Sequence, residues 1–188
     1  MCRSYPIVKL RTRAPAQVPK RTMSQAIRLL TRNDVPALID LIVAIELFRP
    51  EEVEDLRTRI TDYLGAKETR EFWIVDDDPK LGLSGVVYCA PEPMTDGTWN
   101  MYFIGVHRDR RGEGRGTKLV RHIEALVLSQ NGRILIVETS ATESFEKTRA
   151  FYARNGYREE ARIREFYRAG DDKVVFWKSL QQSRVQGA

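Results

Sequence analysis

Apolar residues recur at different spacings along this chain, and the spacing indicates the type of element. Residues 35–42 repeat their apolar positions every three or four residues, so they predict a helix, with Asn33 as its N-cap. A second helix is predicted from Pro50, because proline suits a first turn and the two glutamates after it lie beside the positive end of the dipole. Ahead of both helices, residues 26–31 indicate a short strand.

After the second helix the spacing changes to that of strands. Residues 72–75 and 81–88 predict two strands joined by a turn at Asp76-Asp77-Asp78-Pro79. The elements predicted after them are a strand at 98–106, a helix behind a glycine-rich turn, a strand at 133–138, a helix at 144–153 that ends at Asn155-Gly156, and strands at 157–163 and 173–180. This order predicts a single α/β (α+β) domain, in which a mixed, mostly antiparallel sheet of about seven strands carries about four helices on both faces.

Length and charge divide the chain into a tail and one domain at residues 23–188. Residues 1–22 carry six basic and no acidic side chains, so the remainder of the chain is close to neutral despite a net charge of +5. A start-site artefact, a basic disordered arm and a transit peptide all remain open for this tail. Because the positive charge is not on the domain, we expect no nucleic-acid partner.

Cysteines, histidines and hydropathy exclude further classes of protein. Cys2 and Cys89 form neither a disulfide framework nor a zinc pattern, and His107 and His122 have no companions with metal-ligand spacing, so no metal is expected. The most apolar stretch, residues 38–48, is too short to span a bilayer. We therefore expect no membrane partner and a cytoplasmic location.

A glycine-rich segment between a predicted strand and helix is typical of a phosphate site. Glycines allow backbone N–H groups to turn inward, and the helix N-terminus adds unpaired donors and a positive dipole end. The spacing of Gly112, Gly114 and Gly116 fits neither a nucleotide-triphosphate loop nor a dinucleotide loop, whose third glycine is replaced by Thr117. A plain turn that binds nothing is the alternative.

The spacing that does fit is Arg-x-x-Gly-x-Gly, formed by Arg111, Gly114 and Gly116, and it resembles the pyrophosphate motif of the GNAT acetyltransferases. Residues 150–157, Ala-Phe-Tyr-Ala-Arg-Asn-Gly-Tyr, resemble a second motif of the same family. The resemblance runs over about residues 26–180 and implies transfer of an acetyl group from acetyl-CoA to an amine, without a metal. It implies that acetyl-CoA contacts Phe103, Ile104, Gly105, Val106, Arg111, Gly112, Glu113, Gly114, Arg115, Gly116 and Thr117.

The same resemblance implies the catalytic groups. Tyr152 matches the tyrosine that protonates the departing thiolate, and the backbone N–H near Ile104 should stabilise the oxyanion. Many relatives carry a glutamate base on the fourth strand, but Asn100 occupies that position here, so Glu138 at the end of the next strand becomes the candidate base. Phe145 replaces an asparagine of many relatives, which removes one expected cofactor contact.

The acceptor site is expected between the first two helices and the turn that joins the last two strands. The candidate residues are Phe48, Glu51, Asn100, Phe166 and Tyr167. A small-molecule primary amine is the predicted acceptor. The rivals are a non-catalytic acyl-CoA sensor and a peptide or protein acetyltransferase, and the family leaves a homodimer through late strands open.

Overall fold

A computed structural model describes residues 27–181, so the tail predicted at residues 1–22 lies outside the described residues. The strands are β1 (Ile27–Leu29), β2 (Phe72–Asp78), β3 (Gly82–Pro91), β4 (Thr98–Val106), β5 (Ile134–Ser140), β6 (Arg158–Arg168) and β7 (Asp171–Ser179). The helices are α1 (Val35–Ile45), α2 (Pro50–Gly65), α3 (Arg115–Ser129) and α4 (Glu146–Arg154), with short 3-10 turns at Arg32–Asp34, Arg108–Arg110 and Glu143–Phe145.

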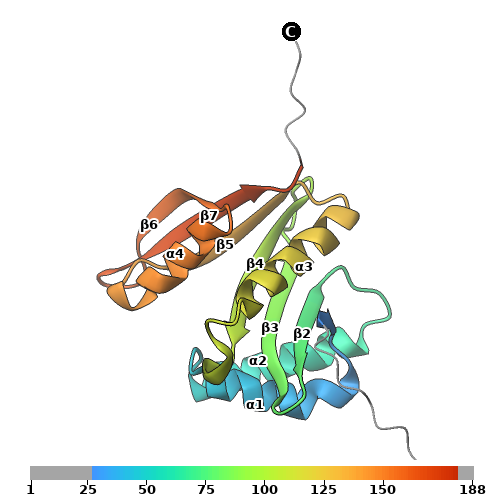
Figure 1. The fold of residues 1–188 in the computed structure, drawn as a ribbon. Coiled ribbons are helices and arrows are strands. Elements are labelled where there is room, and N and C mark those ends of the chain that lie inside the picture. The colour runs from blue at the N-terminus through green and yellow to red at the C-terminus, as the bar shows by residue number, and fades with distance from the viewer. Residues whose placement is uncertain (1–26, 182–188) are drawn as a thin grey trace, which may run out of the picture.

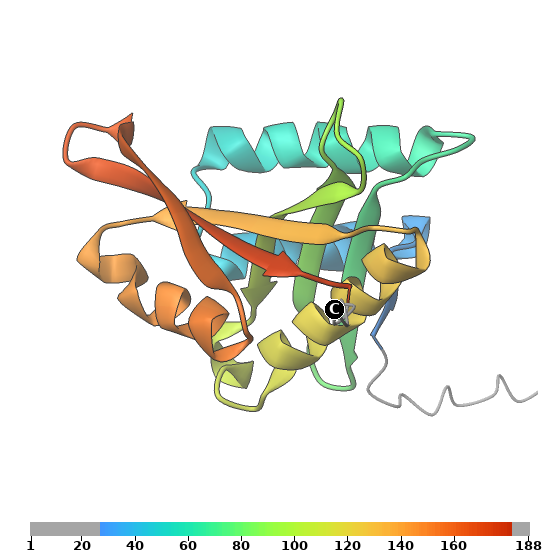
Figure 2. The same cartoon turned by 90° about the horizontal axis from the view of Figure 1, so that it is seen from above.

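All seven strands form one sheet in the order β1-β2-β3-β4-β5-β7-β6. Neighbouring strands run antiparallel, except for β4 and β5, which are parallel. Helices α1 and α2 cover one face, while α3 and α4 lie on the other (Figures 1 and 2). The predicted mixed sheet with helices on both faces is confirmed.

Each face of the sheet has its own core. Leu38 and Ile42 of α1 and Ile60 of α2 are fully buried against strand residues such as Trp73 and Val86. The core on the opposite face is formed by α3, α4 and the strands, and its fully buried members include Met101, Leu119, Ile123, Val127, Leu135 and Val137. Side chains that alternate along the strands therefore point into two apolar cores, one on each face of the sheet.

The N-cap predicted at Asn33 is wrong. Asn33 lies inside the 3-10 turn Arg32–Asp34, and α1 begins only at Val35. The Asp34 carboxylate accepts hydrogen bonds from the Thr31 backbone N–H (2.8 Å) and hydroxyl (2.6 Å), and it pairs with Arg28 at 2.7 Å. A charged carboxylate with three donors holds this turn more strongly than a neutral amide cap could.

The turn predicted at Asp76-Asp77-Asp78-Pro79 is also wrong for its three aspartates, because β2 continues to Asp78 and all three are buried. Buried carboxylates need partners. Arg28 pairs with Asp77 at 2.7 Å, and Arg115 pairs with both Asp76 and Asp78. These arginines are distant in the sequence, so the local composition indicates a turn where long-range ion pairs maintain a strand.

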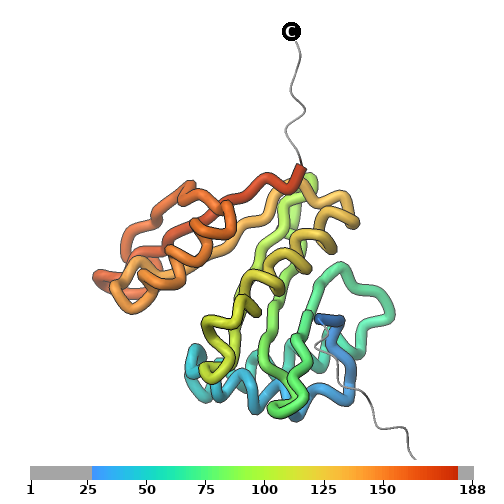
Figure 3. Tube along the Cα trace, viewed as in Figure 1, coloured from blue at the N-terminus to red at the C-terminus, as the bar shows by residue number. Residues whose placement is uncertain are grey.

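The centre of the sheet is split. Strands β4 and β5 pair only where Thr98, Trp99 and Asn100 face residues 134–136, and beyond that point they separate (Figure 3). On its other edge β4 carries a bulge, because Tyr88 pairs with Phe103 and Cys89 with Met101, which leaves Tyr102 as the extra residue. The gap between β4 and β5 begins next to this bulge.

Candidate functional site

The glycine-rich loop has the open backbone expected of an anion site. Gly112 (φ 83°) and Gly114 (φ 74°) are left-handed, and nothing lies within 4 Å of a Cβ built on either glycine. A side chain would be strained at both positions, since the left-handed region favours glycine. Within residues 27–181, no hydrogen-bond partner is found for the backbone N–H groups from residue 112 to residue 117. The loop and the first turn of the 15-residue α3 therefore present free donors.

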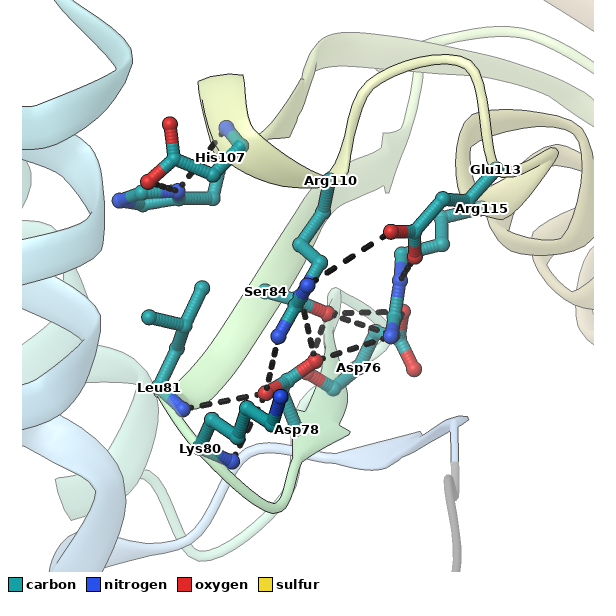
Figure 4. Close-up of polar contacts among 10 residues, drawn as sticks. Asp76, Asp78, Lys80, Leu81, Ser84, His107, Arg110, Glu113 and Arg115 are labelled. Atoms are coloured by element: carbon teal, nitrogen blue, oxygen red, sulfur yellow. Dashed lines mark hydrogen bonds and ion pairs between the residues drawn. The ribbon is translucent and has the colours of Figure 1, made fainter.

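Arg115, the first residue of α3, does not point its side chain into the open loop. Its guanidinium is 5% exposed and pairs with Asp76 at 2.8 Å, with Asp78 at 2.9 Å and with Glu113 at 2.9 Å, as Figure 4 shows. It also donates to the Ser84 hydroxyl at 2.8 Å. Its contact to an anion in the loop is thus limited to its backbone, and its side chain fastens α3 to the β2–β3 hairpin.

Asp78 is the second anchor of this network. Burial raises its pKa, but hydrogen bonds from Arg110 and from the backbone N–H groups of Lys80 and Leu81 outweigh burial and lower the pKa to about 2. Arg110 also pairs with Glu113 at 3.6 Å (Figure 4). Arg110 is thus engaged with the hairpin, and Glu113 is engaged with Arg110 and Arg115.

A cleft of about 1100 Å³ lies between the loop, β4 and α4. The predicted cofactor residues that line it are Ile104, Gly105, Val106, Arg111, Gly112, Gly114, Arg115, Gly116 and Thr117. Phe103 and Glu113 do not line it: Phe103 packs in the core on the α1–α2 face, and Glu113 pairs with arginines. The wall also includes Arg121, Lys147 and Arg154, which form no ion pair within the described part of the chain. Free N–H groups and unpaired cations fit a pyrophosphate and a further phosphate.

The register of β3 and β4 determines where the β4 backbone donors point. The N–H of His107 bonds to the Ser84 carbonyl at 2.8 Å, so this pair is a hydrogen-bonded one. Bonded and non-bonded pairs alternate in an antiparallel ladder. The N–H groups of Ile104 and Val106 therefore point away from β3, into the gap that β5 has left.

Tyr152 of α4 joins the cleft to the gap. It lines the cleft although its side chain is only 3% exposed, and it packs against Phe151, Tyr157 and Phe176. Burial, with a contribution from the charge of Tyr167, raises the pKa of Tyr152. The hydroxyl thus keeps its proton at neutral pH.

The predicted acceptor residues are distributed over the α1–α2 face. Phe48 packs edge-on against Phe103 at 5.1 Å and lines a second hollow of about 730 Å³ along α2. Glu51 is exposed beside Arg49 and lines neither hollow. Asn100 is buried, and its amide donates to Glu92 at 2.8 Å.

The remaining predicted residues lie on the far side of the gap. Glu138 pairs with Lys173 at 3.0 Å, and the Lys173 ammonium lies 3.7 Å from the centre of the Phe166 ring. Tyr167 is half-exposed next to Phe166, and burial, with the charges of Glu138 and Asp171, raises its pKa. The predicted base is therefore an ion-paired carboxylate.

Two residues at the gap, Glu92 and Tyr102, are not among the residues predicted from the sequence. Tyr102 lies within the strand predicted at 98–106, and a bulge has no reliable local signal. Glu92 lies between two predicted strands, and the one local signal is its position between Pro91 and Pro93, which indicates a restricted backbone. Within residues 27–181, no group of three or more ligating side chains could hold a metal ion, and no helix is long and apolar enough to cross a membrane.

Known proteins share this architecture. A GNAT-family protein from Desulfovibrio desulfuricans superposes with a TM-score of 0.78 and 28% identity, covering 84% of this chain and 100% of that chain. An aminoglycoside 6′-N-acetyltransferase complexed with coenzyme A gives a TM-score of 0.67 at 20% identity, covering 84% and 98%. The amino-acid acetyltransferase of Pasteurella multocida (strain Pm70) is 29% identical over 129 residues, which are 68% of this chain. The chain spans only 27% of that relative's length.

The model of the acetyltransferase (GNAT) domain family matches residues 68–159. These residues include β2 to β5, the glycine-rich loop, α3 and α4, and they supply most of the wall of the cleft. The cleft and the split sheet are thus built from the segment that matches the family, and the chain has the GNAT fold.

Proposed function

We propose that this protein transfers the acetyl group of acetyl-CoA directly to the primary amine of a small molecule. The observation that carries the proposal is the gap between β4 and β5, which opens on one face to the cation-lined cleft and on the other to the α1–α2 face. The similarity to a protein named amino-acid acetyltransferase supports an amine on a small molecule as the acceptor.

The residues of the cleft fit acetyl-CoA. The N–H groups of residues 112–117 would hold its pyrophosphate, and Arg111, Arg121, Lys147 and Arg154 are the cations available for the 3′-phosphate. When bound, acetyl-CoA supplies an activated thioester. The N–H of Ile104, directed into the gap, is placed to stabilise an oxyanion there.

Tyr152 is the proposed general acid. Its raised pKa keeps the phenol protonated, so it can give a proton to the thiolate when the carbon–sulfur bond breaks. Glu138 remains the sequence-based prediction for the base, and its carboxylate is paired with the Lys173 ammonium.

The experiment is calorimetric titration with acetyl-CoA, followed by mass spectrometry of a pool of amino acids, polyamines, aminoglycosides and short peptides incubated with acetyl-CoA. We expect a product that is heavier by one acetyl group. Tyr152→Phe should lower turnover more than about tenfold while acetyl-CoA affinity stays within about twofold, because only a proton is lost. Tight acetyl-CoA binding without any product would favour the sensor, and failure to bind would refute the proposal.

A further inference from the structure

The α1–α2 side of the gap carries the features of a binding site that the predicted residues do not account for. Tyr102, the bulge residue of β4, is 48% exposed and stacks on Tyr88 at 5.3 Å. Tyr102, Phe166 and Tyr167 are the exposed aromatic side chains within residues 27–181. All three lie on the strands that border the gap or on the hairpin beyond it.

Glu92 provides the carboxylate on this side. Its Oε1 accepts a hydrogen bond from the Asn100 amide at 2.8 Å and lies 3.5 Å from the Tyr102 hydroxyl. No arginine, lysine or histidine of the described residues forms an ion pair with Glu92, whereas Glu138 is neutralised by Lys173 at 3.0 Å. Glu92 is therefore a carboxylate at the gap that has no cation of its own among the described residues.

The backbone of Glu92 is fixed before any ligand arrives. Pro91 and Pro93 flank it, and proline restricts both its own φ and the residue before it. Its N–H donates to the Thr98 carbonyl at 2.9 Å, and its carbonyl accepts from the Thr95 hydroxyl at 2.9 Å. The backbone of Glu92 therefore has little conformational entropy left to lose when the residue binds a ligand.

Asn100 holds the Glu92 carboxylate, but one of its own polar atoms is left without a hydrogen bond. It is 4% exposed, and its Oδ1 has no hydrogen-bond partner among residues 27–181. A buried acceptor without a partner is unfavourable, and an apolar residue at this position would avoid that loss. The hydrogen bond to Glu92 is the contact that an apolar residue could not make. The asparagine therefore fits a role in orienting Glu92 toward the gap.

Other charges lie around Tyr88, the ring on which Tyr102 stacks. Arg59 of α2 donates to the Tyr88 hydroxyl at 3.2 Å, and Glu71, just before β2, accepts from that hydroxyl at 3.2 Å. Burial, the charge and hydrogen bond of Glu92 and the charge of Glu138 raise the pKa of Tyr102, while the charge of Arg59 opposes them. Glu92 and Glu138 thus place negative charge near Tyr102, which suits a cationic ligand, and Arg59 places one positive charge there.

We propose that Glu92 binds the acceptor's ammonium group and takes its proton, and that the acceptor is a primary amine with a neighbouring aromatic group. This inference rests on the proposed function. Glu92 removes one proton from R–NH3+ and releases it to water. The amine nitrogen then forms a bond to the thioester carbon, and the carbon–sulfur bond breaks. The second proton passes from nitrogen to Glu92, which releases it to water. The thiolate takes the proton of the Tyr152 hydroxyl, and water returns a proton to Tyr152. The aromatic group packs against Tyr102, Phe166 and Tyr167.

The test uses the full chain, acetyl-CoA and tyramine, with ethanolamine as the probe that lacks a ring. Wild-type protein, Glu92→Gln, Glu92→Asp and Glu138→Gln are compared by kcat/KM over the pH range in which the wild type is folded. Asp96→Asn is the matched control, because Asp96 lies in the same hairpin loop and is 98% exposed. Calorimetry measures acetyl-CoA binding to each variant, and tyramine binding to each CoA-loaded variant.

We expect Glu92→Gln to lower kcat/KM for tyramine at least about 100-fold and to move the acid limb of the pH profile upward, to the ionisation of tyramine's own ammonium group, because this variant can use only the free amine. Glu92→Asp should keep that limb, Asp96→Asn should match the wild type, and all should bind acetyl-CoA equally. An acid limb that stays at its wild-type position in Glu92→Gln, or that moves only in Glu138→Gln, overturns the assignment of Glu92. A merely structural role would lower kcat without changing the shape of the profile.

Tyramine that neither binds nor reacts, or that is used no better than ethanolamine, overturns the proposed acceptor class. The proposed function fails separately: it is lost only if acetyl-CoA does not bind or no amine in the wider pool is acetylated. The two failures are therefore distinguished by acetyl-CoA titration and by the pooled amines.

Discussion

Replacing Arg115 with methionine should destabilise the protein more than any substitution of an exposed arginine. The guanidinium is 5% exposed and joins α3 to Asp76 and Asp78, whose side chains are 5% and 2% exposed. Asp78 keeps Arg110 and two backbone donors after the substitution, but Asp76 keeps only the Ser84 hydroxyl. Leaving a buried charge without its partner costs about 3–5 kcal/mol.

Urea unfolding followed by circular dichroism measures this loss, and thermal unfolding should show a Tm lowered by about 10 °C. In the double variant Asp76→Asn/Arg115→Met the unpaired charge is absent, so the two changes should be non-additive by at least about 1 kcal/mol. Arg162→Met is the control, because Arg162 is 45% exposed and pairs with Glu159 at the surface. That substitution should change stability by less than about 1 kcal/mol.

The same variant tests what the network does for the loop. Arg115 directly follows Gly114, so a displaced guanidinium would allow the first turn of α3 and its N–H groups to move. Acetyl-CoA affinity should therefore fall for Arg115→Met and not for Arg162→Met. If the free energy of unfolding of Arg115→Met lies within about 1 kcal/mol of the wild-type value, the ion pairs do not hold the loop and this explanation is refuted.

Three further outcomes are expected. Gly114→Val should weaken acetyl-CoA binding by calorimetry, because a β-branched residue is strained at φ 74°; unchanged affinity would contradict the loop assignment. Hydrogen bonds from Arg28 lower the pKa of Asp34 to about 2, and the pKa of Asp78 is also about 2. Both carboxylates therefore stabilise the fold above pH about 4 and lose that contribution as the pH falls toward 2. Urea midpoints should decline over that window, and less steeply in Asp78→Asn. Gly116→Val should also impair acetyl-CoA binding, since its Cβ would lie 3.2 Å from the Phe151 ring; normal binding would show that the ring can move.

The sequence predicted the elements whose signals are local. Residues 98–106 were expected as a strand and form β4 over those residues, and the helix end at Asn155-Gly156 is confirmed by a left-handed Gly156. Hydrophobic spacing and glycine punctuation are readable within a short window. The glycine-rich loop could be located for the same reason.

The sequence could not predict contacts whose partners are remote. Asp76 and Asp78 were interpreted as a turn because Arg115, 37 residues after Asp78, is needed to keep them in a strand. Arg115 was assigned to the cofactor loop, and its spacing gave no indication that its guanidinium turns toward the hairpin. Burial and long-range ion pairing determine both the strand conformation of the aspartates and the direction of the Arg115 side chain.

The missing glutamate on β4 shows how such distant contacts matter for chemistry. From the sequence of the strand alone, Asn100 indicates that the glutamate base is absent. In the folded chain the register of β3 and β4 places Asn100 opposite Ala90, two residues before Glu92, and the asparagine amide holds that carboxylate. A carboxylate is therefore present beside the gap, delivered from the adjacent strand end. Because Tyr152 reaches the gap from the opposite face of the sheet, a proton donor and a candidate proton acceptor flank the point where the thioester would lie. The substitution at position 100 thus changes which residue carries the charge, and it does not by itself favour a sensor over an enzyme.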